Sequence, residues 1–110
     1  MNTAAPLRVL VLGAYGLIGG AVADRLAAAG HRVTGLGRRV IAVSRARPHM
    51  AWIACDIAAC TSPADWAPLI AGMDVVVNCA GALQDGPRDD VRAVQETAML
   101  ALWQACAAAG

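Results

Sequence analysis

The chain has 110 residues, of which 58% are hydrophobic and 15% are charged, and its formal net charge is +1 at pH 7. This length suits one domain, and the composition excludes a disordered chain. The charge balance excludes the basic footprint of a protein that binds nucleic acid or an anionic membrane surface, and no apolar run approaches the roughly 20 residues of a membrane span.

The first half of the chain alternates between strand and helix patterns. A β-branched and leucine run over Arg8–Leu12 predicts a strand, and Arg32–Leu36 predicts a second one. Between them, Leu17–Ala29 has helical periodicity, and Gly30 is a natural stop because glycine enters the left-handed conformation without strain. The apolar residues of this helix fall on one face: Leu17, Ala21, Val22, Leu26 and Ala29. The short run Val40–Arg47 fits either a strand or a short helix.

The second half continues the alternation. Ala51–Cys55 predicts a third strand, and Asp74–Cys79, with three consecutive valines, predicts a fourth. Between them, Ser62 followed by Pro63 is typical of a helix start, and we expect that helix to end before Gly72.

The remaining residues complete the predicted architecture. Gly81–Pro87 is expected to form a loop, and an alanine-rich helix runs from about Asp89 to a stop at Gly110. The order favours an α/β fold, with a parallel, doubly wound sheet of about four strands flanked by helices in one unit over residues 1–110. Because the alternation stops after a helix, we expect the N-terminal portion of a larger domain. The sheet edge that a further strand would cover is then a candidate surface for self-association.

Three glycines between the first strand and the first helix form the most informative motif. Gly13 would permit the tight turn out of the strand, Gly16 would let the backbone approach a pyrophosphate, and Gly19 would let helix and strand pack closely. The unpaired N–H groups of the helix N-terminus would hold the phosphates. In this context the motif predicts a dinucleotide site, with an ordinary glycine-rich turn as the alternative.

The Gly-x-x-Gly-x-x-Gly spacing within Val11–Gly19 resembles the short-chain dehydrogenase/reductase superfamily, above all its extended and atypical branches. Those branches include epimerases, reductases and non-catalytic NADP sensors. The resemblance implies a Rossmann-type fold that binds NAD(P), with further loop residues at the cofactor: Tyr15, Leu17 and Ile18. Two departures favour an atypical branch: Leu12 stands where many extended members have threonine, and Ala93–Thr97 keeps only the threonine of an Asn-x-x-Gly-Thr pattern.

Two further segments extend the resemblance. Asp56 and Ile57 are similar to the pair that follows the third strand in the superfamily and contacts the adenine. The stretch Val77–Gly81 looks like the superfamily's Asn-x-Ala-Gly motif, which implies that four residues line the far side of the cofactor: Asn78, Cys79, Ala80 and Gly81. From the residues alone, Asp56 also fits a helix or turn cap, and the second segment also fits a plain strand-to-loop turn.

The end of the second strand bears on the choice of cofactor. An acidic residue there would bind the ribose hydroxyls of NAD, but the position is Gly37, followed by Arg38 and Arg39. A guanidinium grips a 2′-phosphate, which a carboxylate would repel. We therefore expect NADP, with NAD as the alternative cofactor and a solvated pair of loop charges as the alternative role of the arginines.

The chain lacks the proton-transferring residues of the superfamily. It contains no lysine, and its one tyrosine, Tyr15, lies in the glycine loop, so it cannot supply the Tyr-x-x-x-Lys pair that moves protons in the superfamily. We identify no catalytic residue. Two function classes stay open. One is the cofactor-binding portion of an NADP-dependent oxidoreductase or epimerase, inactive without its catalytic half; the other is a non-catalytic NADP sensor or an accessory subunit of a respiratory complex.

The four cysteines, Cys55, Cys60, Cys79 and Cys106, have neither close paired spacing nor a secretory context. We expect buried structural thiols, with zinc or redox roles as the alternatives, and no metal site, since the two histidines complete no ligand pattern. Met1–Pro6 shows no signal peptide, so the expected location is the cytoplasm.

Overall fold

The computed structural model describes residues 6–14, 17–38, 44–45, 50–79 and 89–109. The chain divides into two compact units. The first comprises Met1–Ala54 and Gly72–Ala80, and the second comprises Cys55–Ala71 and Gly81–Gly110. Each unit is described by itself below.

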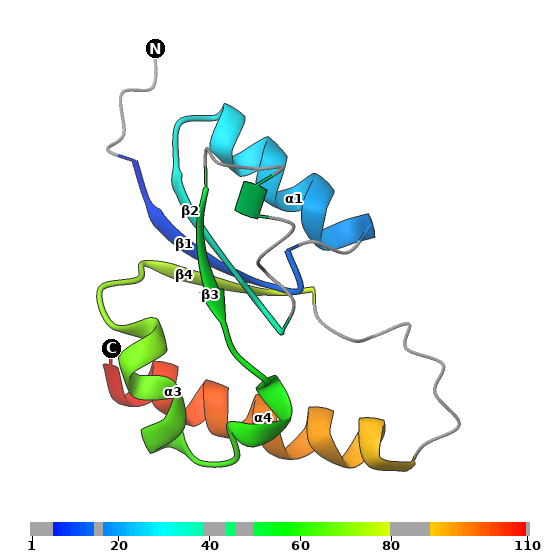
Figure 1. The fold of residues 1–110 in the computed structure, drawn as a ribbon. Coiled ribbons are helices and arrows are strands. Elements are labelled where there is room, and N and C mark those ends of the chain that lie inside the picture. Colours follow the sequence, from blue (N-terminus) through cyan, green and yellow to red (C-terminus); the bar gives the residue numbers. More distant parts are fainter. Residues whose placement is uncertain (1–5, 15–16, 39–43, 46–49, 80–88, 110) are drawn as a thin grey trace. The chain divides into compact units, whose positions relative to one another are not determined.

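The first unit is a parallel β-sheet with one helix packed on it (Figure 1). Its elements are β1 (Arg8–Leu12), α1 (Leu17–Ala28), β2 (Arg32–Gly37), β3 (Ala51–Ala54) and β4 (Val75–Asn78). The strand order is β3-β2-β1-β4, and every described pair is parallel. This is the first part of the doubly wound order expected from the alternating pattern. The four predicted strands are confirmed, with small shifts at their ends.

The central strand β1 carries the core of this unit. Val9 and Val11 point to the face that α1 covers, because successive side chains of a strand alternate between faces. Val9, Leu10, Val11 and Leu12 are all buried. Burial on both faces explains why this strand has a continuous apolar run rather than an alternating one.

Helix α1 packs with a different face from the one expected. Ala21 and Ala29 are exposed, whereas Ala23 is fully buried and Leu26 and Ala27 contact the apolar cluster beneath the helix. The predicted face was therefore wrong in part. At the start of the helix the residue against the sheet is Gly19, because the backbone of Gly13 lies too close there for a side chain, whereas Leu26 packs on the cluster further along.

The end of α1 confirms the predicted stop at Gly30. This glycine has a φ of 94°, in the left-handed region. Its N–H donates to the Ala27 carbonyl oxygen at 3.0 Å, and the His31 N–H donates to the Leu26 carbonyl oxygen at 3.1 Å. The two bonds form a Schellman motif, which satisfies the last carbonyls of the helix and turns the chain into β2.

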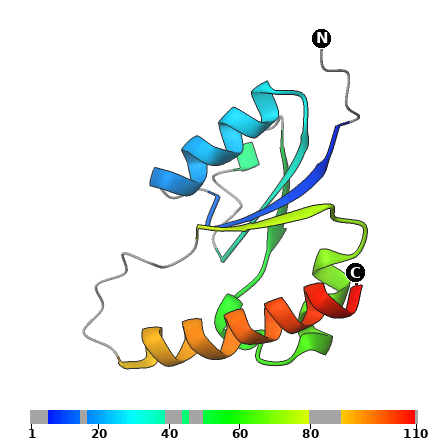
Figure 2. The same cartoon turned by 180° about the vertical axis from the view of Figure 1, so that it is seen from behind.

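The second unit consists of η1 (Ile57–Ala59), α3 (Pro63–Ile70) and α4 (Asp89–Ala109), and Figure 2 shows α3 and α4 side by side. Both long helices match the sequence prediction, whereas η1 was not predicted. Of the ambiguous run Val40–Arg47, the structure describes only Ser44 and Arg45, which are helical. No described helix is both long and apolar enough to cross a membrane.

Trp66 holds the second unit together. Its side chain is fully buried, and its indole N–H lies 3.1 Å from both the Cys60 and the Ala98 carbonyl oxygens. This shared donor links α3 to α4 and to the turn before α3. The start of α3 is fixed by Asp65, whose carboxylate accepts the N–H of Ser62 at 3.1 Å, as in a capping box.

Candidate functional site

The carboxyl ends of three strands meet at one edge of the sheet in the first unit. Leu12, the last residue of β1, lies opposite Leu36 of β2 and Asn78 of β4. The Gly13 N–H donates to the Leu36 carbonyl oxygen at 2.9 Å, and the Cys79 N–H donates to the Leu12 carbonyl oxygen at 3.0 Å. These bonds extend the ladders by one residue and bring the ends of β1, β2 and β4 to the same level.

The chain order makes this edge a switch point of the sheet. From β1 the chain passes through α1 to β2 on one side, and the strand on the other side of β1 is β4. Open α/β sheets bind ligands in the crevice outside the carboxyl ends of the strands at such a point. The N-terminus of α1 begins five residues after the end of β1, at the same edge (Figure 1). The first N–H groups of an α-helix have no carbonyl partner within the helix and point outward from its start.

Two of the three motif glycines are described, and each has a steric reason to be glycine. Gly13 has a φ of 71°, in the left-handed region that glycine enters without strain. A Cβ on Gly19 would collide with the Gly13 carbonyl group, 2.8 Å from its carbon, and would lie 3.2 Å from the Ala14 Cα. This is the close contact between helix and strand that the sequence predicts for Gly19.

The end of β2 has the composition that the sequence analysis singled out. Gly37 is its last residue and is buried, and Arg38 follows with an exposed side chain. No carboxylate occupies the end of this strand. The guanidinium of Arg38 therefore stands one residue beyond the strand, at the edge that also carries Gly13 and Asn78.

The other predicted residues fall into three groups. Asn78, exposed, and Cys79, half-buried and packed against the core cluster, lie at the same edge of the first unit. Leu17 and Ile18 open α1, and the Ile18 side chain is 59% exposed. Five residues lie outside the described part of the chain: Tyr15, Gly16, Arg39, Ala80 and Gly81.

Asp56 and Ile57 belong to the second unit. They follow the last residue of β3 by two and three positions, and Ile57 begins η1. Asp56 is exposed, and its carbonyl oxygen accepts the Ala59 N–H at 2.9 Å. The predicted adenine contact therefore sits on a tight turn directly after the third strand.

A pair of thiols flanks the same turn, and the sequence analysis missed it. The Sγ atoms of Cys55 and Cys60 lie 3.4 Å apart, within hydrogen-bonding range for sulfur. Burial, the hydrogen bond and charge of Cys55, and the carboxylates of Asp65 and Asp56 raise the pKa of the Cys60 thiol to about 12. A separation of five residues across a sharp turn was the available signal. Within the described residues, no group of three or more His, Cys, Asp or Glu side chains is placed to hold a metal ion.

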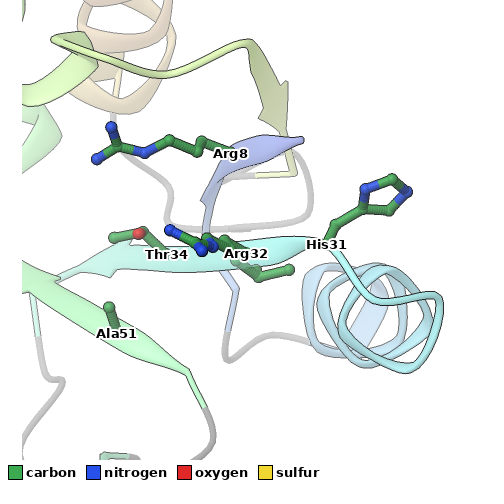
Figure 3. Close-up of a pocket in the computed structure, with 6 residues that line it drawn as sticks. Arg8, His31, Arg32, Thr34 and Ala51 are labelled. Atoms are coloured by element: carbon green, nitrogen blue, oxygen red, sulfur yellow. The ribbon is translucent and has the colours of Figure 1, made fainter. Parts of the chain in front are cut away.

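A hollow of about 510 Å³ lies at the opposite edge of the sheet, at the amino ends of the strands (Figure 3). Arg8 and Arg32, which pair in register, project over it together with Thr34, while the His31 ring points away from the Arg8 guanidinium. The Nδ1 atom of His31 accepts the Leu7 N–H at 3.0 Å. Because Arg8 and Arg32 begin their strands, this hollow is separate from the edge that carries the glycine loop.

The comparisons with known proteins point to one family. The family model described as the NAD dependent epimerase/dehydratase family matches residues 9–110. Among solved structures, a short-chain dehydrogenase from Salmonella enterica serovar Typhi CT18 is 28% identical with a TM-score of 0.73, over 91% of this chain and 51% of that one. No curated protein matches the chain.

Two of the matched structures hold nicotinamide dinucleotides. One is AtPrR2 with NADP⁺ and (+)pinoresinol, at 20% identity and a TM-score of 0.65, over 93% of this chain and 34% of that one. The other is the Bordetella bronchiseptica enzyme WbmH with NAD⁺, at 23% identity and a TM-score of 0.55, over 86% of this chain and 37% of that one. At these identities both show a shared fold alone.

The chain thus spans about half of the Salmonella dehydrogenase and about a third of the other two proteins. The family match covers nearly all of this chain, and the parallel sheet with its glycine-rich turn agrees with it. The chain belongs to the NAD dependent epimerase/dehydratase family, within the short-chain dehydrogenase/reductase superfamily, and carries the NAD(P)-binding part of its Rossmann fold.

Proposed function

We propose that this chain is the NADP-binding portion of an oxidoreductase or epimerase, with the pyrophosphate seated on the Gly13–Gly19 loop at the N-terminus of α1. The observation that carries the proposal is the meeting of Gly13, the start of α1 and Asn78 at the switch point between β1 and β4. Partial positive charge from the helix N-terminus attracts phosphate there, and glycine leaves room for it. The cofactor supplies hydride chemistry when bound.

The preference for NADP over NAD rests on the end of β2. NAD-binding members of such folds place a carboxylate there for the ribose hydroxyls, and this chain has Gly37 followed by the exposed Arg38. A guanidinium offers two parallel N–H donors to the oxygens of a 2′-phosphate, and it neutralises their charge. Arg39, next in the sequence, would add to this attraction.

The site is tested by one substitution and one control. Gly16→Val should abolish binding of NADP, because a branched side chain would occupy the position that the resemblance gives to the pyrophosphate. Ala21→Val adds similar bulk to the exposed side of α1 and should leave binding unchanged. Isothermal titration calorimetry measures both, and circular dichroism verifies that both variants fold. Equal NADP affinity in Gly16→Val and in the unchanged protein would place the phosphates elsewhere and overturn the proposal.

A second candidate is a protein that holds NADP without turning it over, as a sensor or as an accessory subunit of a respiratory complex. The chain has no lysine among its 110 residues, and the proton-transferring tyrosine of the superfamily needs a lysine partner, so the chain by itself fits this candidate as well as the first. For either candidate we expect this chain by itself to bind NADP without oxidising NADPH in the presence of carbonyl substrates. Steady loss of NADPH absorbance with the purified chain would contradict this, and a Tyr-x-x-x-Lys pair elsewhere in a longer protein would decide for the enzyme.

A further inference from the structure

The turn between β3 and α3 holds two thiols in a position to react with each other. Cys55 directly follows β3 and is half-buried, while Cys60 lies after η1 and is only 5% exposed. Their sulfur atoms are 3.4 Å apart, and both residues belong to the second unit. We propose that Cys55 and Cys60 are a redox-active pair that forms a reversible disulfide with small-molecule disulfides or hydroperoxides.

The two sulfurs already lie close to bonding distance. A disulfide needs about 2.05 Å between the sulfurs, so the 3.4 Å separation must shorten by about 1.4 Å. η1, a single 3₁₀ turn, lies between the two residues, with hydrogen bonds from the Ala59 N–H to the Asp56 carbonyl oxygen at 2.9 Å and from the Cys60 N–H to the Ile57 carbonyl oxygen at 3.0 Å. Because the Trp66 indole N–H holds the Cys60 carbonyl oxygen at 3.1 Å, we expect the movement to fall on the two side chains and on the Cys55 end of the turn. Such a short element adjusts more easily than a long helix.

The two thiols differ in the way that a stepwise reaction requires. Cys55 is the more accessible sulfur and meets the oxidant first. Cys60 is buried, and its raised pKa of about 12 keeps it as the neutral thiol at physiological pH. Because the thiolate is the nucleophile, Cys60 reacts slowly with oxidants in solution. Once Cys55 has been oxidised, its hydrogen bond and its charge no longer raise the pKa of Cys60, so Cys60 loses its proton more easily and acts as the resolving thiol.

The reaction balances with either class of oxidant. With a disulfide RSSR, the Cys55 thiolate forms a mixed disulfide and releases RS⁻; the Cys60 sulfur then displaces the second RS⁻, and its proton leaves with that thiolate. With a hydroperoxide, Cys55 becomes a sulfenic acid as ROOH is reduced to ROH, and attack by Cys60 forms the disulfide and releases water. In both cases the pair loses two electrons and two protons, and a dithiol reductant returns them.

The consequence for the cofactor rests on the proposed function. Asp56 and Ile57, the predicted adenine contacts, lie inside the ring that the disulfide closes. Drawing the sulfurs together displaces the turn that presents them, so oxidation should weaken NADP binding. By linkage, bound NADP should make the pair harder to oxidise by the same factor.

Peptide mapping tests the disulfide without any cofactor. The protein is treated with glutathione disulfide or with hydrogen peroxide, freed of the oxidant, unfolded in denaturant that contains an excess of alkylating agent, and cut on the amino side of each aspartate. The four cysteines then fall in four peptides: 24–55, 56–64, 74–84 and 90–110. We expect peptides 24–55 and 56–64 to be recovered as one cross-linked species, lighter by two hydrogens than their sum and separated by dithiothreitol, with Cys79 and Cys106 alkylated.

Variants and a binding measurement separate this proposal from the proposed function. Cys106→Ser should leave the cross-link intact, and Cys55→Ser should abolish it and leave Cys60 free for alkylation after unfolding. Recovery of Cys55 and Cys60 as alkylated thiols, as mixed disulfides only, or paired with other cysteines would overturn the redox pair, whatever the protein binds. If the cross-link forms but oxidised and reduced protein bind NADP equally, the pair stands and its coupling to the cofactor fails. If neither form binds NADP, the proposed function fails while the disulfide remains.

Discussion

Gly19 of α1 rests directly against Gly13 at the end of β1: a Cβ on Gly19 would come within 2.8 Å of the Gly13 carbonyl carbon. The colliding atoms belong to the Gly13 backbone, so neither rotation of a side chain nor a small shift can relieve the collision. We predict that Gly19→Ala destabilises the fold by about 2–3 kcal/mol, the upper part of the range for overpacking. The loop must also move, so NADP affinity should fall.

Gly30→Ala is the matched control for this prediction, because it adds the same methyl group at the other end of the same helix. Gly30 has a φ of 94°, but nothing lies within 4 Å of the place that its Cβ would take. We expect a loss of about 1 kcal/mol from the left-handed conformation alone, with unchanged NADP affinity. Urea denaturation and calorimetry measure the two effects. Equal losses in both variants would mean that contact between helix and strand is not what requires Gly19.

The second prediction concerns Arg38. If its guanidinium holds the 2′-phosphate, Arg38→Ala should weaken NADP by about 1.5–3 kcal/mol, roughly ten- to hundred-fold, and leave NAD nearly unchanged. Arg32 is the control, since it is an exposed arginine at the opposite end of the same strand. Arg32→Ala should change neither affinity. A parallel loss of NADP and NAD in Arg38→Ala would show that this arginine contributes only general electrostatic attraction, and the preference for NADP would be wrong.

The third prediction concerns the buried indole of the second unit. Trp66→Phe keeps most of the apolar surface but removes the N–H that serves the Cys60 and Ala98 carbonyl oxygens. A buried carbonyl left without a donor costs about 1–3 kcal/mol, so the free energy of unfolding should fall by that amount. Trp103→Phe is the matched control, because Trp103 is 48% exposed on α4 and its replacement should cost less than about 0.5 kcal/mol. Similar losses in both variants would assign the effect to aromatic size rather than to the hydrogen bond.

The elements that the sequence predicted correctly are those with local signals. Each strand is an apolar run ended by a turn residue, and Gly30 and Ser62 mark helix ends by their own backbone preferences. The parallel order follows from alternation and the handedness of crossovers. The glycine loop could be predicted for the same reason, because its spacing lies within seven residues.

The features that the sequence did not predict depend on contacts between distant residues. A Cβ on Gly35 would lie 2.5 Å from the Trp52 ring, so this glycine in β2 makes room for a side chain of β3. Trp66 meets Ala98 across 32 positions. The turn η1 brings the two thiols together, and a helix of three residues is too short to be predicted from hydrophobic periodicity. The prediction of the inner face of α1 was partly wrong because the short distance between the helix start and the sheet decides which residue fits there, and hydrophobic periodicity does not show that distance.

The last prediction concerns the outer edge of β4. Among the described strands, β4 pairs only with β1, so it forms one edge of the described sheet, and Val75 is 39% exposed. Such an edge is a template for pairing with a second chain. We predict that the chain self-associates through β4 and that Val75→Lys reduces this association, because a charge on an edge strand opposes pairing. The control is Ala51→Lys on β3, the strand at the other edge, where Ala51 is also exposed. Static light scattering over a range of concentrations measures the mean mass of each variant. A chain that stays monomeric, or one whose association is lost with Ala51→Lys and kept with Val75→Lys, would show that β4 is not the associating edge.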